Sequence, residues 1–115
     1  MEVFPGIWPT PVLAMIDTAA PWCIFDPVIG EALRDHVDVL RERVWIDSRL
    51  GRFRGTLCQE RLRIVADGGE NLDVEVLMFL CPDWSGGNFI GYEGALDRIR
   101  FAVDPHRNRF YFSTL

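Results

Sequence analysis

The sequence contains no lysine, so all 12 of its Lys/Arg positions are arginine. Acidic residues outnumber them by 17 to 12, and the resulting net charge of -5 argues against a surface that binds nucleic acid. No apolar run approaches the roughly 18 residues that span a bilayer, and prolines interrupt the apolar stretch at the N-terminus. We therefore expect no membrane segment and no secretory signal, and a cytoplasmic protein.

Cysteine and histidine are also scarce. The three cysteines, Cys23, Cys58 and Cys81, have no Cys-x-x-Cys spacing, and the two histidines belong to no metal motif. This pattern predicts reduced, buried thiols and no metal or other cofactor, unless folding alone assembles a site from two cysteines and one histidine. No Gly-x-Ser-x-Gly motif is present, which excludes the commonest signature of a serine nucleophile.

What the sequence does have is a series of short apolar segments separated by turns that contain glycine and proline. Its length of 115 residues and its 49% hydrophobic content suit a single domain over residues 1–115. Apolar runs and alternation predict strands over residues 22–25, 37–47, 56–66, 72–81, 89–91, 100–103 and 109–113. Helical spacing predicts a helix from Pro27 to about His36, capped by Asp26, and one or two helical turns over 92–98. The fold class expected is mainly β: a small closed β-barrel or a twisted sandwich with one or two short helices.

The segment Val12–Pro21 carries the one carboxylate that asks for a chemical explanation. Its first five residues are apolar and run directly into Asp17, and prolines bound the segment on both sides. A short apolar run of this kind predicts a strand buried on both faces, with Asp17 where that strand ends. A buried carboxylate needs partners, so Asp17 either caps a turn by accepting from nearby amides or belongs to a reactive site.

Two motifs in this chain resemble those of the retropepsin-like aspartic proteases. Asp17-Thr18-Ala19-Ala20 is similar to the Asp-Thr-Gly-Ala or Asp-Ser-Gly-Ala active-site signature of that family, with alanine at the glycine position. Phe89-Ile90-Gly91, followed by a short stretch that contains Leu96, is similar to the second family signature. The two motifs stand in the family order, with Gly91 lying 74 residues after Asp17.

This resemblance implies a closed barrel of the retropepsin type and an aspartic endopeptidase of bacterial origin. Asp17 is then the catalytic residue, and because the chain has one such motif, the enzyme is a homodimer with Asp17 contributed by each copy. Thr18, Ala19 and Ala20 form the active-site loop, and Ile90 and Gly91 pack behind it. The hairpin between residues 37–47 and 56–66 is a flap over the peptide or protein substrate. The residues expected in this flap are Gly51, Arg52, Phe53, Arg54 and Gly55.

Three functions stay open at this point. The first is the homodimeric aspartic endopeptidase. The second is a catalytically inactive dimer of the same fold that binds peptides or proteins, which is favoured by Ala19 because a methyl replaces a residue with unusual backbone freedom. The third is a monomeric structural domain in which Asp17 only caps its turn and the hairpin is an ordinary surface feature.

Overall fold

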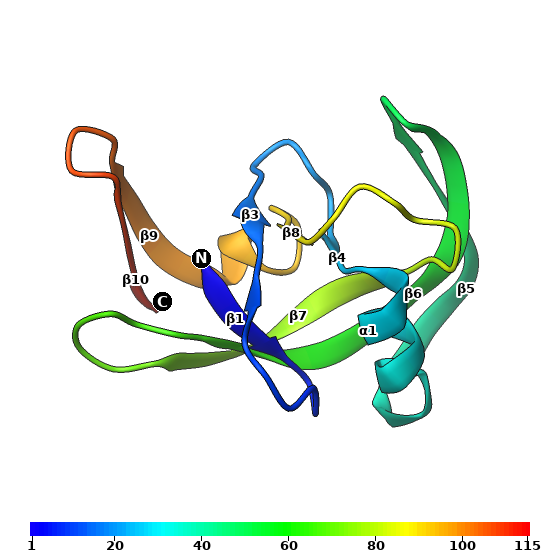
Figure 1. Cartoon of the computed structure of the whole chain (residues 1–115), viewed down its shortest axis with the longest axis horizontal. Coiled ribbons are helices and arrows are strands. Elements are labelled where there is room, and N and C mark those ends of the chain that lie inside the picture. Colours follow the sequence, from blue (N-terminus) through cyan, green and yellow to red (C-terminus); the bar gives the residue numbers. More distant parts are fainter.

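The computed structural model describes residues 1–115 as one strongly curved sheet with a short helix packed against it (Figure 1). Strands hold 50% of the residues and helices 11%, and the main sheet forms a nearly closed barrel, so the mainly β prediction is confirmed. The strands are β1 (Glu2–Pro5), β2 (Val12–Leu13), β3 (Met15–Ile16), β4 (Cys23–Ile24), β5 (Asp38–Ser48), β6 (Gly51–Ile64), β7 (Leu72–Leu80), β8 (Phe89–Ile90), β9 (Ile99–Asp104) and β10 (Arg109–Thr114). The helical elements are α1 (Pro27–Leu33) and the 3₁₀ turns η1 (Arg34–His36) and η2 (Leu96–Arg98).

The main sheet is organised around β6, its longest strand. The strand order is β2-β1-β6-β7-β4-β8-β3, and β5 also pairs with β6. Most neighbours are antiparallel, but β4 is parallel to β7 and β3 is parallel to β8. Because β8 also pairs with β4, this two-residue strand lies between the strand that precedes Asp17 and the strand that follows it.

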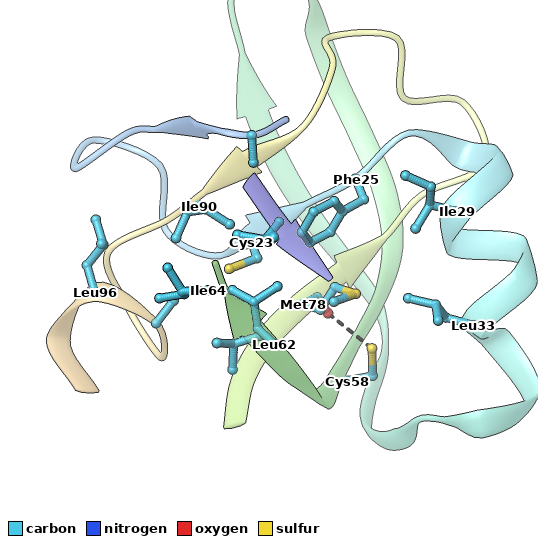
Figure 2. Close-up of a cluster of buried hydrophobic side chains, with 14 of the residues drawn as sticks. Cys23, Phe25, Ile29, Leu33, Cys58, Leu62, Ile64, Met78, Ile90 and Leu96 are labelled. Atoms are coloured by element: carbon cyan, nitrogen blue, oxygen red, sulfur yellow. Dashed lines mark hydrogen bonds between the residues drawn. The ribbon is translucent and has the colours of Figure 1, made fainter. Parts of the chain in front are cut away.

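The core fills the inside of the curved sheet (Figure 2). Met78 and Leu62 contribute from β7 and β6, while Ile29 and Leu33 close one side from α1. Each fully buried side chain of this size stabilises the fold by about 1.5–3 kcal/mol relative to exposure. Other buried members are Val3, Cys23, Phe25, Cys58, Ile64, Val76, Ile90, Leu96 and Ile99.

The helix α1 forms as its sequence predicts. The Asp26 carboxylate accepts a hydrogen bond of 3.0 Å from the Val28 amide, and Pro27 occupies the first turn, where no amide donor is needed. Ile29 and Leu33, four residues apart, share the face that packs on the core. The helix then tightens into η1, so the predicted helical stretch from Pro27 to His36 is confirmed.

One local prediction needs correction. The apolar run from Val12 to Ile16 is not one strand buried on both faces: it divides into β2 and β3, and Leu13 and Met15 are 72% and 64% exposed. The physical reason is that successive side chains point to opposite faces, so Leu13 and Met15 lie on the exposed face while Ala14, between them, is buried in the core. In the stretch 92–98 one helical turn forms, η2, as predicted.

The hairpin of β9 and β10 forms a separate two-stranded sheet that extends away from the rest of the molecule (Figure 1). Its strands pair from Ile99 with Thr114 to Asp104 with Arg109. Phe101 and Phe110 stack across it with ring centroids 5.5 Å apart, and Phe110 reaches the edge of the core. Both predicted strands at the C-terminal end of the chain are therefore confirmed.

Candidate active site

Asp17 lies directly after β3, at the start of a tight turn. Its amide donates to the carbonyl of Ile90 over 3.0 Å, which continues the pairing of β3 with β8 by one residue. The side chain is half-buried and forms no ion pair, so the expectation of a carboxylate enclosed by a buried strand is wrong. The turn instead presents Asp17 at the surface of the molecule.

The carboxylate of Asp17 is held by its own turn. Its Oδ1 atom accepts a hydrogen bond of 2.9 Å from the Ala19 amide, and the Asp17 carbonyl accepts one of 3.2 Å from the Ala20 amide. The first contact is an Asx turn, which fixes the direction of the carboxylate and leaves Oδ2 without a partner in the chain. Thr18 and Ala19 are exposed beside it, and Ala20 is half-buried.

The segment behind this turn is β8 with the glycine that follows it. Ile90 is 1% exposed, and the Tyr92 amide donates to the Ala20 carbonyl over 2.8 Å. A Cβ atom at Gly91 would lie 2.8 Å from the amide nitrogen of Trp22 and closer still to its carbonyl group. Gly91 therefore permits an approach of two backbones that any larger residue would prevent.

Trp22 follows the turn and belongs to a second apolar cluster. Its indole ring stacks on Phe79 with centroids 6.0 Å apart, and its Nε1 atom is buried without a hydrogen-bond partner. The cluster continues through Ile24 and Trp84 to the inner face of the β5–β6 hairpin. The residue after the turn thus links the candidate site to the hairpin through packed aromatic side chains.

Asn88 also holds this region together, although the sequence gives no signal that it should. Its side chain donates to the Leu13 carbonyl over 3.1 Å and accepts from the Asp26 amide over 2.8 Å. Its backbone carbonyl accepts from the Met15 amide over 2.9 Å. Asn88 therefore joins β2, β3 and the start of α1, three segments that lie far from it in the chain.

The expected flap is a hairpin, but its residues are not at the tip. The turn consists of Arg49 and Leu50, whereas residues 51–55 already belong to β6. The ring of Phe53 meets the edge of Trp84 at a centroid distance of 5.2 Å, so the inner face of the hairpin rests on the loop after β7. In Figure 1 this hairpin tip, the loop after β7 and the turn between β3 and β4 extend toward the same side of the molecule.

Two arginines of β6 lie beside the exposed ring of Trp45 in β5. The guanidinium groups of Arg52 and Arg54 lie 4.5 and 5.8 Å from the centre of the Trp45 ring. Arg52 also pairs with Asp47 over 3.6 Å, with both side chains largely exposed. Such contacts order the hairpin but add little stability each.

The thiols do not form a second catalytic set. All three cysteines are free and buried. Burial raises the pKa of Cys23 to about 12, opposed in part by a hydrogen bond with the backbone of Gly91. Burial, with the nearby charge of Glu60, raises the pKa of Cys58 to about 12, and its Sγ atom bonds the Met78 carbonyl over 3.3 Å (Figure 2). Thiols of this kind are poor nucleophiles near neutral pH.

Comparisons with protein-family models, with curated proteins and with solved structures give no match to this chain. Its helices are all too short or too polar to serve as a membrane span. The structure places no three His, Cys, Asp or Glu side chains together in a way that could hold a metal ion.

Proposed function

We propose that two copies of this chain form an aspartic endopeptidase of the retropepsin-like type, with Asp17 of each copy at the two-fold axis. The observation that carries the proposal is the position of Asp17 on an exposed turn, with its carboxylate fixed by the Ala19 amide and β8 placed behind it. A fixed carboxylate with one free oxygen and no cationic partner can act on a bound water.

Two adjacent Asp17 carboxylates can act as a base and an acid together, which a single carboxylate cannot do. At a separation of roughly 3 Å and an effective dielectric constant near 20, two negative charges repel by about 5 kcal/mol. The pair would therefore share one proton, as the aspartic-protease dyad does. The ionised Asp17 would accept a proton from water as this attacks the peptide carbonyl, and the protonated Asp17 of the other copy would donate to the carbonyl oxygen.

Ala19 does not argue against activity. The chain has only two non-glycine residues with positive φ, Arg43 and Asn108, so Ala19 does not adopt the left-handed conformation that would require glycine. Its amide still donates to Asp17. The Thr18 hydroxyl has no hydrogen-bond partner inside the chain and is exposed, so it is free to bond the backbone of a second copy.

A dimeric peptide-binding module without catalysis is the second candidate. It is favoured by the Asx turn itself, because Asp17 already has a structural role that requires only one oxygen acceptor. The two candidates share the dimer, and they differ in what Asp17 does to a bound peptide.

The test compares the wild type with Asp17→Asn in peptide-library cleavage at about pH 4 to 7, together with sedimentation of both proteins. Asparagine keeps the Oδ1 acceptor for the Ala19 amide, so we expect an unchanged dimer and loss of cleavage. Asp83→Asn, in the exposed loop after β7, is the matched control and should cleave at the wild-type rate. Equal cleavage by Asp17→Asn would refute the enzyme, and a dimer that binds peptides without cleaving them would establish the binding module.

A further inference from the structure

A cavity of about 330 Å³ lies away from the Asp17 turn, between α1, the base of the β5–β6 hairpin and the end of β7. None of its lining residues belongs to the segment between β3 and β4. Its lining residues come from α1, from β5 and β6, and from the end of β7 and the residues after it; these elements are drawn in Figure 1. The volume falls in the range that holds small organic ligands.

Three arginines line this cavity: Arg34 from η1, Arg43 from β5 and Arg54 from β6. Arg34 has a carboxylate partner, Glu31, at 3.4 Å. Arg43 and Arg54 have no carboxylate within 4.0 Å, although the chain holds more acidic than basic residues. Neither Arg43 nor Arg54 therefore forms an ion pair within the chain.

The backbone around the cavity is held in conformations that need an explanation. Arg43 has φ of 56°, where the pairing of β5 with β6 is irregular between Arg41 and Val44. A side chain other than glycine rarely adopts this conformation unless its surroundings impose it. A Cβ atom at Gly55 would overlap the Leu80 carbonyl oxygen, so glycine lets the hairpin base approach β7 and close the cavity wall.

The other residues that line the cavity include apolar side chains and two glutamates, which reduce its net positive charge. Val37, Leu80 and Cys81 contribute apolar surface. Two glutamates, Glu31 and Glu42, offset two of the three arginines, which leaves one net positive charge. That balance suits one negative charge, and the net charge of -5 on the whole chain disfavours a polyanion.

We propose that this cavity binds a small organic monoanion, a carboxylate on a compact apolar body. The carboxylate lies between Arg43 and Arg54, where guanidinium groups form strong charge-assisted hydrogen bonds. The apolar body packs on Val39 and Leu80. Trp45 helps to position Arg54, whose guanidinium group lies 5.8 Å from the ring centre.

The probe is benzoate, titrated into the ¹⁵N-labelled protein and followed by NMR, with acetate and benzyl alcohol as ligands that keep only the charge or only the ring. We expect benzoate to bind more tightly than either, with shifts at the amides of Gly30, Gly55 and Cys81. Equal affinity for benzyl alcohol, or shifts confined to other parts of the chain, would overturn the proposal.

Two variants and one control complete the test. Arg43→Asn removes the guanidinium group and keeps a residue that tolerates positive φ, and Arg54→Gln removes the second guanidinium group. Each should weaken benzoate binding on the order of tenfold or more. Arg52→Gln is the control, because Arg52 contacts the same Trp45 ring but does not line the cavity. Should Arg43→Asn fail to fold, Arg54→Gln decides alone, and unchanged affinity in a folded variant refutes the site.

Discussion

Replacement of Gly91 by alanine tests the arrangement behind the Asp17 turn most directly. Gly91 does not have positive φ, so alanine is compatible with its backbone conformation and any effect is steric. The added methyl would lie 2.8 Å from the Trp22 amide nitrogen and closer to its carbonyl carbon and oxygen. All three are backbone atoms held between β8 and β4, so they cannot move aside as the end of a flexible side chain can.

The expected loss of stability is large for a single methyl group. Overpacking in a well-packed core costs about 1–3 kcal/mol. Separation of the two segments also weakens hydrogen bonds on either side, from the Tyr92 amide to the Ala20 carbonyl and from the Asp17 amide to the Ile90 carbonyl, at about 1 kcal/mol each. We therefore expect a decrease of about 3–5 kcal/mol in the free energy of unfolding, or roughly 12–20 °C in Tm for a domain of this size.

Urea denaturation followed by circular dichroism measures this change, with Gly68→Ala as the matched control. Gly68 has no heavy atom near its Cβ position and no positive φ, so the control should change stability by less than about 1 kcal/mol and is expected to stabilise slightly. A Gly91→Ala protein within about 1 kcal/mol of the wild type, at an unchanged m value, would show that β8 does not cross Trp22 this closely.

Three further outcomes concern protonation. The native protein should not react with a thiol reagent near neutral pH, because all three cysteines are buried and burial raises the pKa of Cys23 and Cys58 to about 12. All three cysteines should react after denaturation. Rapid labelling of any one of them in the native state would contradict this burial. The stability that these two thiols contribute should be complete below about pH 9 and should decrease between about pH 9 and 12, as the unfolded chain ionises first. The hydrogen bond from Arg63 lowers the pKa of Asp73, so this carboxylate stabilises the fold above its ordinary pKa near 3.8 and loses that contribution as the pH falls through the lowered value. Acid titration of Asp73→Asn should lack this small component, and an acid-unfolding curve identical to that of the wild type would show that the pair contributes nothing.

Local sequence patterns determined most of the secondary structure. Asp26-Pro27 and the spacing of Ile29 and Leu33 give the helix, because capping and amphipathic periodicity act within one or two turns. The glycine-rich turn at residues 67–71 and the alternation on each side of it give β6 and β7, since side chains in a strand alternate between faces. Asp17 also stood out from the sequence alone, as a carboxylate at the end of an apolar run.

Tertiary structure decided what local patterns could not. The exposure of Leu13 and Met15 depends on which face of the sheet the core covers, and strand order depends on pairing between distant segments. Residues 51–55, which the family resemblance implies in a flap, belong to β6, and Arg49 and Leu50 form the tip because β5 and β6 stay paired to Ser48 and Gly51.

The fold class, the helix and the single carboxylate at which the chemistry is proposed could all be predicted, because each depends on residues close together in the chain. Folding of the whole chain placed β8 between β3 and β4, joined Asn88 to Leu13 and Asp26, and gathered Arg34, Arg43 and Arg54 around one cavity. No local pattern could reveal these contacts, because they join segments up to 75 residues apart. Such contacts form only when the whole sheet closes, and no local pattern specifies which residues then meet.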